Sequence, residues 1–223
     1  GKMTISGDGE MLSSFGFDQR ITSVEIGAGI TKLSDYVFEG CTNITNITVS
    51  KDNNNYCDED GILFSKDKKT LCCYPPSKSG ETYIIPDSVT TILEAFYKNQ
   101  NLKTITVSKN VNEINFFAFA YSENLSCVNI LSNIGYVVAD SFIGCHKLTT
   151  INVDNEYYKS IDGIVFSKDK TKLCVFPNGR PETSYTVPSS VKTISQSAFM
   201  DCDNLVNITI PGNVKVIGWT AIR

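Results

Sequence analysis

The chain has 223 residues, of which 41% are hydrophobic and 20% are charged, a composition typical of a globular protein with a substantial core. Its 20 Lys and Arg residues against 24 Asp and Glu residues give a net charge of −4, which argues against binding to nucleic acid or to an anionic membrane surface. No apolar stretch approaches the roughly 20 residues that a transmembrane helix requires, so we expect no membrane insertion within this chain.

Eight short segments of the form apolar-x-x-apolar-x-apolar recur along the chain. Their last apolar residues are Ile26, Val49, Ile85, Val107, Ile130, Val153, Val187 and Ile210. The steps between these residues are 23, 36, 22, 23, 23, 34 and 23, so the two longer steps exceed 23 by 13 and 11, as one insertion used twice would produce. Alternating apolar residues over such short segments predict one β-strand in each unit.

Each unit continues with a second recurring phrase, a Val or Ile followed three residues later by Ile or Leu, and then a small residue and an aromatic one. The phrase spans Ile30 to Phe38, Val89 to Phe96, Val111 to Phe119 and Val191 to Phe199. A unit of about 23 residues cannot bury its apolar side alone, so neighbouring units must stack and share a core. The sequence therefore predicts a solenoid in which the phenylalanines stack from unit to unit.

Two insertions, 50–82 and 154–184, are copies of each other. GILFSKDK, which starts at Gly61, returns as GIVFSKDK, which starts at Gly163, 102 residues later. Each copy continues into a second β-rich run that is ended by Pro75 or Pro177. Two apolar runs on either side of a short Lys/Asp turn predict a β-hairpin in each insertion.

We therefore expect a single repeat-solenoid domain over residues 1–223. One face carries a parallel β-sheet of about eight short strands, spaced about 4.8 Å apart. The other face consists of turns and short helical segments, and the two β-hairpins are inserted into the stack.

The full phrase I-P-x-x-V-x-x-I-x-x-x-A-F-x-x-C-x-x-L-x-x-I-x-I-P resembles the BspA-like leucine-rich repeat family of bacterial and protist surface proteins. Residues Thr186 to Pro211 follow it nearly residue for residue, whereas Asn99, Ser122 and Ile222 depart from it. The resemblance implies a leucine-rich-repeat-like fold, a cap strand within 1–20, and a secreted or cell-surface location. Because the last unit stops at Arg223 with no following strand, we expect a truncated C-terminal repeat.

The eight cysteines do not predict a disulfide framework. Cys145 and Cys202, for example, occupy the same place in units two apart, about 10 Å from each other, which exceeds the roughly 7 Å that a disulfide can span between alpha carbons. We expect buried free thiols instead. One bridge stays open, between Cys57 and either Cys72 or Cys73, inside the first insertion.

We predict no catalytic residue, no metal site and no cofactor. Cys-x-x-Cys and His-x-x-x-His spacings do not occur, and the chain has one histidine. Cys145 precedes that histidine, but neighbours in sequence seldom point at each other as a nucleophile and its base must. The acidic turn 58–61 lacks the ligand spacing of a calcium loop.

The outward side of the strands is the most informative surface, because alternation places a row of uncharged polar side chains on it. The candidate binding residues are Asn46, Thr48, Thr104, Thr106, Asn129, Thr150, Asn152, Thr186, Asn207 and Thr209. Such a row suits a solvated strand that binds nothing, and it equally suits a rigid surface that recognises an extended protein or glycan. The hairpins, with Tyr74, Phe176 and their lysines, are a second candidate surface.

The resemblance implies a non-enzymatic binding module of a secreted or cell-surface protein that mediates protein-protein interaction or adhesion, with host extracellular matrix among its partners. The expected partner is a protein or a glycan, not a nucleic acid. Two alternatives stay open: a structural stalk that presents another domain, and a carbohydrate-active enzyme built on a parallel β-helix. Such an enzyme requires at least two strands per coil and an outward cluster of acid-base groups, whereas here the outward row is Thr and Asn, and the Ala-Phe phrase replaces the additional strands.

Overall fold

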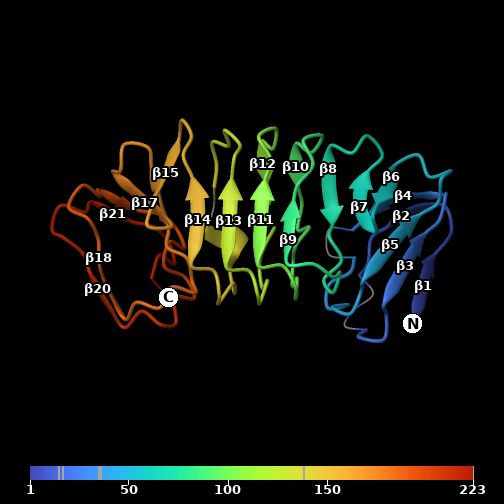
Figure 1. The fold of residues 1–223 in the computed structure, drawn as a ribbon, viewed down its shortest axis with the longest axis horizontal. Coiled ribbons are helices and arrows are strands. Elements are labelled where there is room, and N and C mark those ends of the chain that lie inside the picture. The colour runs from blue at the N-terminus through green and yellow to red at the C-terminus, as the bar shows by residue number, and fades with distance from the viewer. Residues whose placement is uncertain (15, 17, 35–36, 138, 223) are drawn as a thin grey trace.

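The computed structural model describes residues 1–14, 16, 18–34, 37–137 and 139–222. The chain forms an elongated solenoid whose repeats lie side by side, from β1 (Lys2–Ile5) at one end to β20 (Asn207–Thr209) and β21 (Val216–Ile217) at the other (Figure 1). The predicted fold class, a repeat solenoid built on parallel strands, is confirmed.

Each repeat contributes one strand to a first row of parallel strands. This row consists of β1, β3 (Ser23–Ile26), β5 (Asn46–Val49), β9 (Thr82–Ile84), β11 (Thr104–Val107), β13 (Cys127–Ile130), β14 (Thr150–Val153), β18 (Ser184–Thr186) and β20. All eight strands predicted from the repeat are among them. Where neighbouring strands of the row pair, they do so without a shift in register. Ile105, Val128 and Ile151 therefore lie side by side and point into the core, while the residues that alternate with them along each strand face outward.

A second row of short strands lines the solenoid where we expected turns and short helical segments. It contains β2 (Gly9–Met11) with β4 (Ile30–Leu33), then β8 (Thr70–Cys73), β10 (Thr91–Ile92) and β12 (Glu113–Ile114), and finally β17 (Lys172–Val175), β19 (Thr193–Ile194) and β21. The described part of the chain has one helix, the 3-10 helix η1 (Ala139–Phe142). The Val-x-x-Ile phrase is extended because its backbone bonds to the preceding copy: Thr91 N donates to Lys69 O, and Leu93 N donates to Leu71 O.

The insertions are part of the solenoid wall. The predicted hairpins are β7 (Ile62–Ser65) with β8, and β16 (Ile164–Ser167) with β17. A third antiparallel strand, β6 (Tyr56–Glu59) or β15 (Tyr158–Ile161), precedes each hairpin. β8 and β17 then pair in parallel with β10 and β19, so each insertion ends as an ordinary member of the second row.

The insertions also divide the first row into three sheets, β1-β3-β5, β9-β11-β13-β14 and β18-β20, where we expected one. Ile47 N donates to Gly61 O (2.9 Å) and Ile151 N donates to Gly163 O (3.0 Å), so an insertion turn occupies the edge at which the next strand would pair. Both glycines have a positive φ, and a Cβ on Gly163 would lie 3.0 Å from the carbonyl oxygen of Thr149. Only glycine fits this left-handed backbone so close to the sheet edge.

Three hydrophobic cores follow the same division. β7 is buried on both of its faces, with Leu63 in the N-terminal core and Ile62 and Phe64 in the central core. β16 separates the central and C-terminal cores in the same way, with Val165 on the central side and its two neighbours on the other. Because side chains alternate along a strand, a single strand serves as the wall between two cores.

A stack of aromatic rings runs through the central core, as the Ala-Phe phrase predicts. Phe96, Phe119 and Phe142 are nearly parallel, with ring centroids 5.4 and 5.2 Å apart. Tyr74 continues this stack at 5.6 Å from Phe96, and Phe176 holds the equivalent place in the C-terminal core. The aromatic residues that end the two insertions therefore belong to the repeat ladder.

Three residues after the aromatic ring, a side chain bonds back to the preceding repeat. Cys145 Sγ donates to Phe119 O (3.1 Å), and Ser122 Oγ donates to Phe96 O (2.8 Å). Asn99, which also departs from the cysteine of the repeat phrase, donates from its amide to the carbonyl of the second-row turn before it. The position requires a small buried donor, and this explains why cysteine, serine and asparagine replace one another there.

All eight cysteines are free thiols, as their spacing predicts, but the expectation of burial holds only for Cys41, Cys145 and Cys174, and the other five are half-buried. The bridge left open between Cys57 and either Cys72 or Cys73 is not formed. Burial raises the pKa of both Cys72 and Cys73 to about 12, so these thiols are neutral at physiological pH.

Candidate functional site

The predicted binding residues all lie on the outward side of first-row strands, where they are exposed or half-buried. β5 carries Asn46 and Thr48, β11 carries Thr104 and Thr106, β13 carries Asn129, β14 carries Thr150 and Asn152, β18 carries Thr186, and β20 carries Asn207 and Thr209. The alternation that predicted this face is therefore present in the structure.

In the central sheet these side chains are linked across the strands. Thr106, Asn129 and Asn152 are register neighbours on β11, β13 and β14. Asn129 Nδ2 donates to Thr106 Oγ1 (3.4 Å), and Asn152 Nδ2 donates to Asn129 Oδ1 (2.9 Å). An amide has two donor hydrogens and two acceptor lone pairs, so each asparagine keeps capacity for a further partner. The row is a pre-ordered line of uncharged hydrogen-bonding groups.

The structure brings together half of the predicted residues and separates the rest. The central sheet holds five of them, and the other five lie on the two sheets beyond the insertions. The expected continuous row is thus interrupted because the insertion turns take the outer edges of β5 and β14. We take the central sheet as the candidate site, and its predicted residues are Thr104, Thr106, Asn129, Thr150 and Asn152.

One residue of this face escaped the sequence reasoning. Ile84 on β9 is the register neighbour of Thr106 and is 71% exposed. The same alternation that selects Thr106 also selects Ile84, but a criterion of uncharged polar side chains excludes an isoleucine. The candidate site is therefore a polar row with a hydrophobic side chain at one end. Lys103 and Glu81, the residues directly before β11 and β9, form an ion pair (2.6 Å) at the N-terminal ends of these two strands.

The two aromatic residues expected on the hairpin surface are not available to a partner. Tyr74 and Phe176 are buried in the cores, where they stack in the repeat ladder. Two of the hairpin lysines pair within their own insertion: Lys68 pairs with Glu59 (2.6 Å), and Lys168 pairs with Asp154. The hairpins therefore present charged side chains to solvent, some of them already paired.

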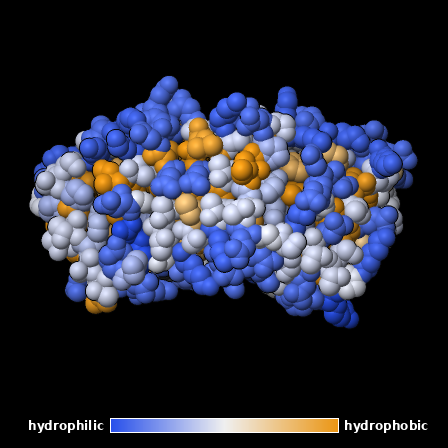
Figure 2. All heavy atoms as spheres, viewed as in Figure 1, coloured by the Kyte–Doolittle hydropathy of each residue, from blue (hydrophilic) through white to orange (hydrophobic). Residues whose placement is uncertain are grey.

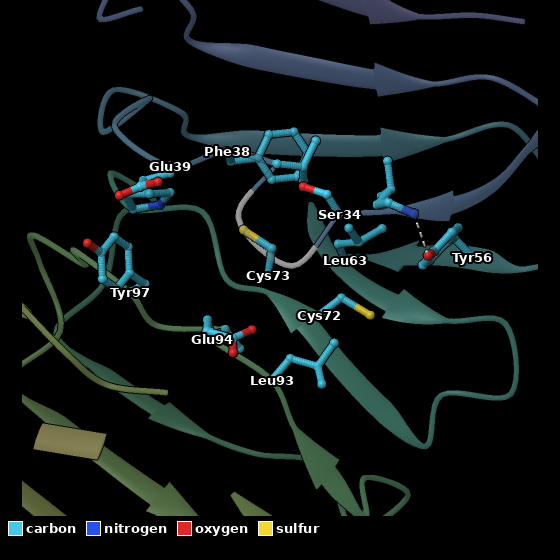
Figure 3. Close-up of a pocket in the computed structure, with 14 residues that line it drawn as sticks. Ser34, Phe38, Glu39, Tyr56, Leu63, Cys72, Cys73, Leu93, Glu94 and Tyr97 are labelled. Atoms are coloured by element: carbon cyan, nitrogen blue, oxygen red, sulfur yellow. Dashed lines mark hydrogen bonds between the residues drawn. The ribbon is translucent and has the colours of Figure 1, made fainter. Parts of the chain in front are cut away.

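A cavity of about 70 Å³ lies where the first insertion meets the second row. Leu33 from the first repeat is part of its lining. So are Tyr56 and Cys72 from the insertion and Leu93 from the third repeat (Figure 3). The hydroxyl of Tyr56 accepts a hydrogen bond from Leu33 N (3.0 Å), which fixes one wall. Hydrocarbon and neutral thiol groups thus make up much of the lining.

An equivalent cavity of about 180 Å³ lies beside the second insertion. Tyr158 stands in the place of Tyr56, and its hydroxyl accepts a hydrogen bond from Val137 N (3.2 Å). The lining is more polar here, since Gln196 Nε2 donates to Asp140 Oδ2 (3.4 Å). The duplicated insertion therefore produces two cavities with different chemistry.

The structure offers no catalytic pair at Cys145 and His146. Cys145 is buried, burial raises the pKa of its thiol to about 12, and its sulfur donates to a backbone carbonyl. His146 Nδ1 instead lies 3.4 Å from Asp203 Oδ2 at the surface. Within the described residues, no group of His, Cys, Asp and Glu side chains is arranged to hold a metal ion. Among those residues, too, no helix has the length and apolar character needed to cross a membrane.

One part of the sequence argument against a β-helix enzyme is wrong. The Val-x-x-Ile phrase forms the second row, so most repeats do have two strands. The other part of that argument concerns the chemistry of the outward row. Its candidate residues are threonines and asparagines, whose side chains do not titrate near neutral pH. Acid-base hydrolysis of a glycan uses paired carboxylates.

The family model described as the BspA type leucine-rich repeat region matches residues 4–61, 72–182 and 172–223, in six copies. No curated protein matches the chain.

Three solved structures are similar in fold. A leucine-rich cell surface protein from Faecalibacterium prausnitzii is 23% identical, with 95% of this chain and 60% of that chain covered and a TM-score of 0.63. The pneumococcal vaccine antigen PcpA is 22% identical, with 90% and 52% covered and a TM-score of 0.59. A leucine-rich repeat protein from Eubacterium ventriosum is 20% identical, with 90% and 58% covered and a TM-score of 0.57. The chain thus spans between 52% and 60% of the length of these structures.

Proposed function

Since the chain belongs to the BspA-type leucine-rich repeat family, we propose that it is a non-enzymatic binding module that engages another protein through its central sheet. The observation that carries the proposal is the linked row of Thr106, Asn129 and Asn152, which continues to the exposed Ile84. These groups are held on a parallel sheet that rests on the aromatic core, so their geometry is fixed before a partner arrives.

An extended segment of protein matches the chemistry of this row. Its backbone N–H and C=O groups recur at the spacing of a strand and can bond to threonine hydroxyls and asparagine amides. Ile84 supplies an apolar contact at one end, and such a contact often contributes strongly to an interface that is otherwise polar. The net charge of −4 favours a protein partner over a nucleic acid.

We place the module on a secreted or cell-surface protein and assign it a role in adhesion, with host extracellular matrix proteins among its partners. Support for this location comes from the solved relatives, one of which is described as a cell surface protein and another as a vaccine antigen. The surface seen in Figure 2 is mainly hydrophilic, with hydrophobic groups in separate spots along its length, as suits a domain exposed to water.

The test is binding of the purified chain to immobilised fibronectin and fibrinogen, measured by surface plasmon resonance. The decisive variant is Thr106→Lys with Asn129→Lys, which places two long charged side chains in the row. Its matched control is Thr91→Lys with Asn112→Lys, which adds the same charge on β10 and in the turn before β12, outside the candidate face.

We expect saturable binding that the Thr106→Lys, Asn129→Lys variant loses and the control variant keeps. Equal binding by both variants would remove the central sheet from the proposal. Absence of binding to any immobilised protein would favour the second candidate function, a structural stalk that presents another domain.

A further inference from the structure

Three aromatic side chains are exposed around the larger of the two cavities. Phe116 and Tyr136 line it and are 51% and 63% exposed. Tyr157, which is 49% exposed, lies over Gly135, where a Cβ would be 3.5 Å from its ring. Large aromatic side chains that are exposed to solvent around a cavity mark a binding surface more often than a structural one.

The repeat does not impose these rings. The position of Phe116 in its unit is occupied by Gln196 in the seventh unit. Tyr136 likewise corresponds to Thr193, and Tyr157 corresponds to Asn55, which directly precedes β6 in the first insertion. Each of the three aromatic residues thus has a polar counterpart in at least one sister unit. Phe116 and Tyr136 line one cavity, and Tyr157 lies over Gly135, the residue before Tyr136. Solenoid packing explains the buried phenylalanines, but it does not explain these three exposed rings.

Polar groups complete the lining. Asp140 and Gln196 meet at the cavity through a hydrogen bond of 3.4 Å, and Lys172 lines the same cavity from β17. A carboxylate accepts hydrogen bonds, an ammonium donates them, and an amide does both. These three groups can therefore bond to a ligand hydroxyl whether it acts as a donor or as an acceptor. The cavity beside the first insertion is the internal reference: it has less than half the volume, and a leucine stands where this cavity has Ser195.

We propose that the cavity formed by Phe116, Tyr136, Asp140, Lys172 and Gln196 binds a pyranose ring of a glycan. A sugar ring has an apolar face of C–H groups and a rim of hydroxyls. The electron-rich face of an aromatic ring attracts the C–H groups, while the carboxylate and amide bond to the rim. A protein segment would satisfy the rings but would have little use for three different polar groups converging on one small cavity.

This site is separate from the central-sheet row, and its residues come from the turns after β12, β13 and β19, from η1 and from β17. A single sugar ring makes few contacts, so binding of one ring is weak, and a repeated glycan would gain from several attachments.

The experiment is saturation-transfer NMR on the whole chain with the methyl glycosides of glucose, galactose, mannose and N-acetylglucosamine. The test variant is Phe116→Gln with Tyr136→Thr, which installs the residues that the seventh unit carries at these positions and so preserves the repeat. The control variant is Leu12→Thr with Val206→Gln, which removes two exposed apolar side chains elsewhere on the surface. A further variant, Asp140→Asn, tests the carboxylate.

We expect saturation transfer from at least one glycoside, a loss of at least tenfold in affinity in the test variant, and no change in the control. The Thr106→Lys, Asn129→Lys variant should still bind the glycoside, which separates this site from the proposed protein-binding face. Transfer that is equal in the test variant and the parent chain overturns the proposal, as does the absence of transfer from every glycoside. Loss of fibronectin or fibrinogen binding in the test variant, without any sugar binding, would assign the rings to a protein partner instead.

Discussion

Replacement of Phe119 by Ala removes the middle ring of the central aromatic stack. The ring is fully buried and lies against Phe96 and Phe142, with centroids 5.4 and 5.2 Å away. Burial of about 150 Å² of ring surface, at about 25 cal/mol per Å², contributes about 4 kcal/mol. We therefore expect the free energy of unfolding to fall by about 4 kcal/mol, which lies within the range of about 3–5 kcal/mol typical of Phe to Ala changes in cores.

Urea unfolding followed by circular dichroism measures this change. The matched control is Phe116→Ala, three residues earlier, where half of the ring is already in water. Because half of this ring is buried, we expect the control to lower the free energy of unfolding by about 2 kcal/mol, about half as much as Phe119→Ala. If Phe119→Ala cost no more than the control, the stack would not be what holds neighbouring repeats together, and the argument from the Ala-Phe phrase to stability would fail.

Three further predictions concern the backbone and the thiols. Gly163→Ala forces a Cβ to within 3.0 Å of the Thr149 carbonyl oxygen at a φ of +79°, so calorimetry should show a loss of about 1–3 kcal/mol in the free energy of unfolding. Gly212→Ala, with open space around it, should show almost no loss, and equal effects of the two variants would contradict the strain argument. Ser122→Ala removes the hydrogen bond to Phe96 O and should cost about 1 kcal/mol in urea unfolding, whereas Ser122→Cys, which keeps a donor, should cost less; the reverse order would refute the donor role. Because burial raises the pKa of the Cys145 thiol to about 12, its thiolate fraction is very small at pH 8 and grows as the pH rises. Alkylation of Cys145 by iodoacetamide should therefore be slow at pH 8 and should accelerate with pH, whereas rapid labelling at pH 8 in the folded chain would show that the thiol is accessible.

Local patterns predicted the elements of this fold well. The six-residue alternation placed eight of the nine first-row strands, and the GILFSKDK copies placed both hairpins. The Ala-Phe phrase placed the aromatic stack, because a ring that recurs at one position of a stacked repeat meets its own copies. The Val-x-x-Ile phrase was read as a turn because two residues are too few for a periodic strand pattern, yet backbone bonds to the preceding copy make it a strand.

The candidate site was predicted only in part. Alternation identifies which residues face outward, and Thr106, Asn129 and Asn152 do so. It does not say which strands share a sheet, and the row proved shorter than expected because Gly61 and Gly163 lie in turns that occupy the strand edges.

The sequence by itself thus determined the repeat, its strands, its stacked core and its outward polar face, since each depends on neighbours within one unit or on the next copy of it. Only the tertiary structure decided where the sheets end, how the cores divide at β7 and β16, and which residues meet at the two cavities. The physical reason is that a carbonyl from a turn satisfies a strand edge as well as another strand does, and the choice between them depends on the path of the chain in space. Phe116, Tyr136 and Gln196 likewise come from three repeats, and no spacing rule within a repeat brings them to one cavity.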